Sequence, residues 1–174
     1  MNIPNVLTAI RFILIPFFAY FLYIEYYSVA LVFFLSGGIT DVMDGYIARK
    51  YNMVTSFGKL ADPVADKLMQ ITALVLLTLH NRIPVFVLII VVAKESFMGL
   101  GSILLYRKEK HVVSANWYGK LATVVFYFAI IAVIVFDLKE PLSGILVGVA
   151  VLPTLFAFVM YSFTYRQIRS DSQK

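Results

Sequence analysis

The chain has 174 residues, of which 61% are hydrophobic and 14% charged, and its mean hydropathy is +0.86. A soluble domain is roughly half apolar and about a quarter charged, so this composition predicts an integral membrane protein. The absence of cysteine excludes disulfide and thiol chemistry. The net charge of +5 comes from residues that flank apolar runs, which is typical of contact with lipid headgroups and argues against nucleic-acid binding.

Six apolar runs are long enough to cross a bilayer, which takes about 20 residues. The expected spans are 5–24, 29–50, 60–80, 84–106, 115–136 and 141–165. Pro84 and Pro141 stand where a helix would begin, a position that tolerates a missing N–H. We therefore expect an all-α fold: one polytopic membrane domain over residues 1–174, with six transmembrane helices.

The basic residues are distributed unequally between the two ends of these spans. Twelve Lys and Arg residues would lie on the side that holds both termini, and only Arg82 and Lys139 on the other. Basic residues mark the cytoplasmic side of membrane proteins. The sequence therefore predicts a protein of a bacterial-type cytoplasmic membrane with both termini in the cytoplasm.

Four of the ten acidic residues lie within positions 41–66. Asp41 and Asp44 are three apart, and Asp62 and Asp66 are four apart, so each pair shares one face of a helix. A connection that folds back after the second span would bring all four carboxylates together near the cytoplasmic surface. Such charges are costly at a membrane, and a hard ion such as Mg²⁺ or Mn²⁺ would relieve their repulsion and bridge them to a phosphate. We predict a metal and phosphate site.

Small residues accompany the aspartates. Gly45, Ala48 and Gly58 leave room for a nucleotide diphosphate to approach the backbone. Arg49 is expected to pair with a phosphate or with one of the aspartates. The Gly37-Gly38 pair is expected to let neighbouring helices approach closely.

These residues form the pattern D-x-x-D-G-x-x-A-R-x8-G-x-x-x-D-x-x-x-D, and the chain matches every fixed position. The pattern resembles the signature of the CDP-alcohol phosphatidyltransferases. The resemblance implies a six-helix homodimeric enzyme with a cytoplasm-facing active site, which transfers a phosphatidyl or phospho-alcohol group from a CDP-linked donor to an alcohol and releases CMP. It also implies residue roles: metal binding by Asp41, Asp44, Asp62 and Asp66, catalysis by Asp66 as the base, and CDP binding by Asp41, Asp44, Gly45, Ala48, Arg49, Gly58 and Asp62.

Three stretches bear on the acceptor. The run Gly58–Lys67 resembles the branch of the family that holds both the phosphatidylglycerophosphate synthases and the CDP-dependent cardiolipin synthases. The first of these implies CDP-diacylglycerol as donor and glycerol 3-phosphate as acceptor. That branch commonly has Arg-Glu where this chain has Lys94-Glu95, and a second lysine in the run that reads Gly-Lys-Leu-Ala-Thr at 119–123. A branch that makes cardiolipin from phosphatidylglycerol therefore stays open as an alternative.

Four basic residues are candidates for binding the acceptor: Lys94, Lys120, Arg107 and Lys108. Lys94 lies in the middle of its span and needs a polar cavity or a carboxylate partner, whereas Glu95 is expected to point elsewhere and not to pair with it. The residues of the 107–110 run are alternatively contacts to lipid headgroups. Asn5, Thr8 and Arg11 share one helix face and are expected either to help close the donor site or to cap and anchor the first helix.

Two interpretations without catalysis fit the sequence less well. A metal-ion transporter would place carboxylates near the bilayer midplane on several helices, whereas here they cluster near one surface on two. A catalytically inactive lipid-binding relative would be expected to lack an aspartate, and none is missing. We therefore predict an enzyme.

Overall fold

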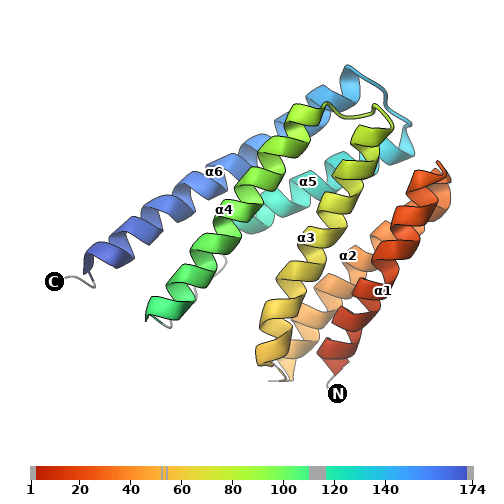
Figure 1. The fold of residues 1–174 in the computed structure, drawn as a ribbon. Coiled ribbons are helices and arrows are strands. Elements are labelled where there is room, and N and C mark those ends of the chain that lie inside the picture. Colours follow the sequence, from red (N-terminus) through yellow and green to blue (C-terminus); the bar gives the residue numbers. More distant parts are fainter. Residues whose placement is uncertain (1–2, 52, 54, 110–116, 172–174) are drawn as a thin grey trace. The chain divides into compact units, whose positions relative to one another are not determined.

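The computed structural model describes residues 3–171 except 52, 54 and 110–116, and the described part is all-helical (Figure 1). The helices are α1 (Ile3–Tyr23), α2 (Tyr27–Lys50), α3 (Ser56–Leu79), α4 (Val85–Glu109), α5 (Trp117–Val135) and α6 (Leu142–Asp171). The all-α prediction and the number of helices are confirmed. Pro84 and Pro141 directly precede α4 and α6, as expected of residues at a helix start.

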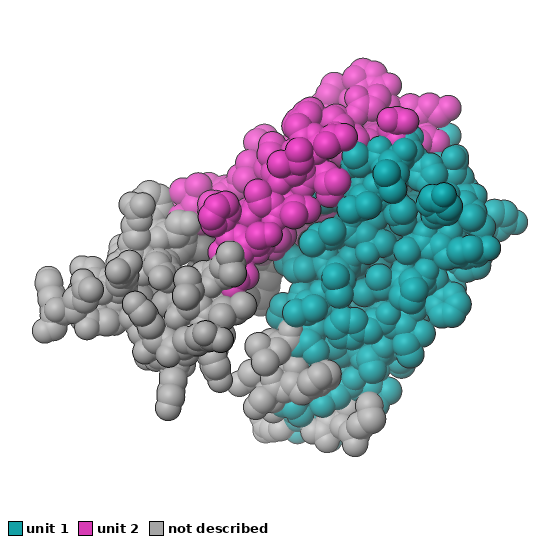
Figure 2. Space-filling model, in the orientation of Figure 1, with its two compact units in different colours: residues 1–80, 134–137 teal, residues 81–133, 138–174 magenta. Residues whose placement is uncertain are grey.

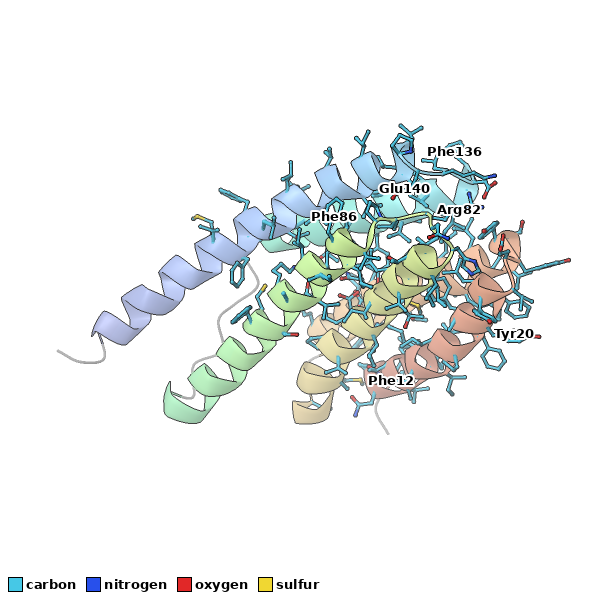
Figure 3. All side chains as sticks on the ribbon, turned by 45° about the horizontal axis from the view of Figure 1, so that its top comes forward. Phe12, Tyr20, Arg82, Phe86, Phe136 and Glu140 are labelled. Carbon is cyan, nitrogen blue, oxygen red and sulfur yellow. The ribbon has the colours of Figure 1, made fainter. Side chains whose placement is uncertain are left out.

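Among the described residues, three helical segments are long and apolar enough to cross a membrane: Ile3–Tyr23, Tyr27–Lys50 and Leu142–Met160. Leu121–Val135 in α5 is apolar but shorter. The large side chains Phe12 and Tyr20 of α1 are exposed, as lipid-facing residues would be (Figure 3). The prediction that all six helices cross the membrane stays a prediction.

The chain divides into two compact units (Figure 2). Unit 1 comprises residues 1–80 and 134–137, and unit 2 comprises residues 81–133 and 138–174. The expectation of one membrane domain over the whole chain stays untested.

Unit 1 is built from α1, α2 and α3, which pack closely. The rings of Phe18 and Phe34 lie 5.2 Å apart between α1 and α2. A Cβ atom at Gly37 would stand 2.6 Å from Cε of the buried Met69, so the glycine makes room for the α3 side chain, as the sequence predicted. Small buried residues continue this packing along α3: Ala61, Ala65 and Ala73.

The connections of unit 1 bring three helix segments to one end of it. Thr55 caps α3: its hydroxyl accepts a hydrogen bond from the backbone N–H of Gly58 at 2.9 Å. The chain therefore folds back between α2 and α3. The start of α1, the end of α2 and the start of α3 all lie at the same end of the unit (Figure 1).

In unit 2, α4 packs against α6 where both helices begin. A Cβ atom at Gly144 would lie 2.9 Å from Cδ of Pro84. Arg82 (labelled in Figure 3) donates from Nη1 to the carbonyl of Leu138 at 3.4 Å, and its own carbonyl accepts a hydrogen bond from the hydroxyl of Ser143. These bonds tie the connection before α4 to the connection before α6.

Candidate active site

Arg11 of α1 lies between the two aspartates of α2. Its Nη1 is 2.8 Å from Oδ1 of Asp41 and its Nη2 is 2.5 Å from Oδ2 of Asp44. Nη1 also reaches the backbone carbonyl of Asp62 on α3 at 3.5 Å. The guanidinium is 1% exposed, so one buried cation joins all three helices. Asp41 and Asp44 share a helix face, as predicted, and that face is turned toward α1.

Thr8 lies one helical turn before Arg11 and contacts the first aspartate of α3. Its buried hydroxyl donates a hydrogen bond to Oδ1 of Asp62, and it also lies 3.1 Å from the carbonyl of Pro4. A further turn back, Oδ1 of Asn5 accepts a hydrogen bond of 2.8 Å from the Thr55 hydroxyl. The polar face of α1 therefore contacts Asp41 and Asp44 of α2, Asp62 of α3, and the Thr55 cap of α3.

Asp66 is held by its own helix. Its Oδ2 accepts a hydrogen bond from Nε2 of Gln70 at 3.3 Å and lies 3.7 Å from Nζ of Lys67. Lys67 in turn donates to Oε1 of Gln70 at 3.3 Å. These contacts fix one oxygen of the Asp66 carboxylate and leave the other outside them.

The carboxylates of α2 and α3 lie within electrostatic range of one another. Asp41 interacts with Asp62, Asp66 and Lys67, and Asp44 interacts with Asp62. No three His, Asp or Glu side chains in the described part of the chain converge closely enough to form a metal site as they stand. In this arrangement Arg11, Thr8 and Gln70 hold the carboxylates instead. The donor set still fits a hard divalent cation, because it is made only of carboxylate oxygens.

The small residues of the pattern lie around the aspartates. A Cβ atom at Gly58 would stand 3.1 Å from Oγ1 of Thr55 and 3.5 Å from Oδ2 of Asp62, so a side chain there would crowd both. Gly45 and Ala48 are partly exposed. The exposed Arg49 lies over Gly45, with Nη1 3.4 Å from where a Cβ would be.

The expectation for Lys94 and Glu95 in α4 was wrong. Nζ of Lys94 lies 2.6 Å from Oε1 of Glu95, and the side chains are 9% and 12% exposed. Neighbouring residues diverge on a helix, but the flexible four-carbon stem of lysine lets the two heads meet. Burial favours that pairing, because an unpaired charge would be costly.

The other acceptor candidates lie outside the described side chains. Arg107 and Lys108 fall in the last turn of α4, and Lys120 falls in the first turn of α5. Their proposed role stays a prediction.

Sequence reasoning did not single out two contact residues. Thr55 had a recognisable signal, since a threonine before an apolar helical run is a typical N-cap. Gln70 stands four residues after Asp66, at the spacing at which helix side chains meet.

The fold and the site define a helical membrane protein with a carboxylate cluster at one end of its first three helices. A family model described as CDP-alcohol phosphatidyltransferase matches residues 1–160. The chain belongs to this family of transferases.

Several curated relatives carry the name CDP-diacylglycerol–glycerol-3-phosphate 3-phosphatidyltransferase. The protein of Haemophilus influenzae is 36% identical, over 92% of this chain and 91% of its own length. The Bacillus subtilis protein is 32% identical, over 79% of this chain and 78% of its own length. The Aquifex aeolicus protein is 30% identical, over 93% of this chain and 94% of its own length.

Proposed function

We propose that this protein transfers the phosphatidyl group of CDP-diacylglycerol to glycerol 3-phosphate, giving phosphatidylglycerophosphate and CMP. The observation that carries the proposal is similarity over nearly the whole chain to proteins named for this reaction. The complete acidic pattern, gathered at one end of unit 1, supports it.

The CDP end of the donor would bind at the carboxylate cluster. Mg²⁺ or Mn²⁺ held by Asp41, Asp44, Asp62 and Asp66 would neutralise charge on the diphosphate. Gly45, Ala48 and Gly58 would leave space for the nucleotide. Arg49, which is exposed beside Gly45, would reach a phosphate oxygen. The polar residues of α1 would act on this site indirectly. Arg11 and Thr8 would orient the aspartates that they contact, and Asn5 would orient the Thr55 cap.

Asp66 would act as the base. A hydroxyl oxygen of glycerol 3-phosphate forms a bond to the β-phosphorus while the bond from that phosphorus to the bridging oxygen breaks, so that CMP leaves. The hydroxyl proton passes to Asp66 as the new bond forms. Lys67 and Gln70 contact Oδ2 of Asp66 and would orient the carboxylate that takes the proton.

Acceptor binding, orientation and assembly complete the proposal. Lys94, Lys120, Arg107 and Lys108 would bind the phosphate of the acceptor. The active site and both termini would face the cytoplasm, and the protein would form a homodimer in the membrane.

The proposal is tested by measuring CMP release from purified protein in detergent with CDP-diacylglycerol and Mn²⁺. Glycerol 3-phosphate and phosphatidylglycerol are offered separately. Asp66→Asn removes the base, and Glu25→Gln is the matched control, because Glu25 is a carboxylate at the other end of unit 1 that contacts Tyr27 and His80.

Release that needs glycerol 3-phosphate, is lost in Asp66→Asn and persists in Glu25→Gln is the expected result. Release with phosphatidylglycerol alone would identify a cardiolipin-forming enzyme instead, the alternative favoured by the single lysine at 119–123. Full activity of Asp66→Asn would refute the assignment of the base.

A further inference from the structure

Arg11 lies where a cation for the acidic cluster is needed. It is 1% exposed, it contacts Asp41 and Asp44 at 2.8 and 2.5 Å, and the Asp44 side chain is itself only 3% exposed. An ionised carboxylate that is this deeply buried requires a partner of opposite charge. Arg11 supplies that charge within the protein itself.

The geometry of the contact leaves part of each carboxylate unused. Arg11 takes Oδ1 of Asp41 and Oδ2 of Asp44, so the second oxygen of each aspartate lies outside the ion pair. Two nitrogens of one planar guanidinium fix both carboxylates at once. Arg11 therefore orients Asp41 and Asp44 without occupying all of their ligand atoms.

The side chain is anchored by these carboxylates more than by its other contacts. Nε of Arg11 is buried and has no hydrogen-bond partner among the described residues. The stem passes Gly37, where a Cβ atom would be 4.0 Å from Cγ of Arg11, an ordinary packing distance. The contacts that place the guanidinium are thus chiefly with charged or polar oxygens.

We propose, building on the function above, that Arg11 is the resident counter-cation of the metal site. In the metal-free protein it neutralises and orients Asp41 and Asp44, so that the site is formed before a divalent ion arrives. Once the ion binds, the permanent charge of Arg11 repels it across the shared carboxylates and weakens its affinity. Arg11 is a positioning residue: it stabilises the site when no metal is bound, and it lowers the affinity of the site for the metal.

The sign of the effect on metal binding follows from charge. Removing Arg11 takes away the one side chain that contacts both Asp41 and Asp44 with positive charge in the described part of the chain, which destabilises the metal-free protein. The same change removes a cation from beside a doubly charged ion, which strengthens ion binding. Loss of orientation acts in the opposite direction. We expect the like-charge repulsion to be the larger effect, because the Arg11 guanidinium is 1% exposed and water therefore screens its charge poorly.

The test is thermal unfolding of purified protein in detergent, without donor or acceptor, in EDTA and in increasing Mn²⁺. Because an ion that binds only the folded state raises its stability, the midpoint of the response reports affinity. Arg11→Met keeps the apolar stem and removes the charge. Arg82→Met is the matched control, because it removes another buried arginine, one that contacts the carbonyl of Leu138 in unit 2.

Arg11→Met is expected to melt below the wild type in EDTA and to reach half of its Mn²⁺ response at a concentration about tenfold lower, the size expected of one lost charge contact worth about 1.4 kcal/mol. Arg82→Met is expected to lower the melting temperature equally at every Mn²⁺ concentration. A midpoint for Arg11→Met that is unchanged or higher than that of the wild type would overturn the proposal.

A second variant keeps the test decisive if Arg11→Met does not fold in EDTA. Adding Asp44→Asn removes the buried carboxylate that Arg11 neutralises, so the double variant is expected to fold. A double variant that stays unfolded would show that Arg11 acts by packing and would refute the counter-cation role. If wild-type protein did not respond to Mn²⁺, the metal site of the proposed function would fall, while the comparison in EDTA would still decide the role of Arg11.

Discussion

Thr8 offers a sharp test of the site, because its hydroxyl links α1 to an aspartate of the acidic pattern. The side chain is buried, and its hydroxyl donates to Oδ1 of Asp62. Thr8→Val has nearly the same shape and removes only the hydrogen bond. We expect this change to slow phosphatidyl transfer by loosening Asp62.

The size of the effect follows from the kind of bond. A hydrogen bond to a charged group contributes about 1.5–3 kcal/mol. Asp62 is partly exposed, so water would replace some of the lost interaction and the lower end applies. A loss of about 1.5 kcal/mol in the placement of Asp62 corresponds to roughly a tenfold fall in kcat/KM.

The assay is CMP release at varied CDP-diacylglycerol and Mn²⁺, with the melting temperature measured in parallel. Thr8→Ser is the control, because it keeps the hydroxyl and should stay close to the wild type. If Thr8→Val matched Thr8→Ser in kcat/KM, the hydrogen bond to Asp62 would have no functional weight and the reasoning would be wrong. A fall in melting temperature with unchanged kcat/KM would assign Thr8 to stability alone.

Three other changes test the surrounding structure by thermal unfolding. Thr55→Ala removes the cap of α3 and should cost about 1 kcal/mol; a melting temperature equal to that of Thr55→Ser would contradict the cap. Glu95→Gln breaks the buried Lys94–Glu95 ion pair and should cost about 3 kcal/mol; replacing both residues by Met should cost less than Glu95→Gln alone, and additive losses would argue against the pair. Gly37→Leu fills the space taken by Met69 and should cost about 1–3 kcal/mol, so an unchanged melting temperature would mean that the Met69 side chain moves aside without cost.

Periodicity predicted much of what the fold shows. Apolar runs gave the helices, and spacings of three and four placed Asp41 with Asp44 and Asp62 with Asp66. The Gly37-Gly38 pair indicated close helix approach, and the space beside Gly37 is filled by Met69. These features depend on one or two helices whose geometry is regular, so local sequence is enough to predict them.

Two ion pairs were not predicted from the sequence. One depends on how helices pack in the folded protein, and the other depends on the flexibility of a lysine side chain. Arg11 was expected near the donor site, but nothing in its own helix indicated that it would pair with two aspartates of α2. Lys94 was expected not to pair with Glu95, because neighbouring side chains diverge on a helix, but the flexible lysine stem lets the two heads meet. Such partners are chosen by burial in the folded protein, where an unpaired charge is most costly.

Charge within the site also predicts the order in which ligands bind. When ionised, Asp41, Asp44, Asp62 and Asp66 carry four negative charges. Arg11 contacts Asp41 and Asp44, and Lys67 contacts Asp66. A divalent ion would add positive charge to this cluster.

A CDP-linked donor adds a diphosphate, so without metal its binding should be opposed by the carboxylates. We expect calorimetric titration with CDP to give no measurable binding in EDTA and clear binding in Mn²⁺, and equal affinity in both conditions would refute this account. Arg11→Met should bind CDP in Mn²⁺ as well, because its site still gains the ion. A variant that lost CDP binding even in saturating Mn²⁺ would instead place Arg11 in direct contact with the donor.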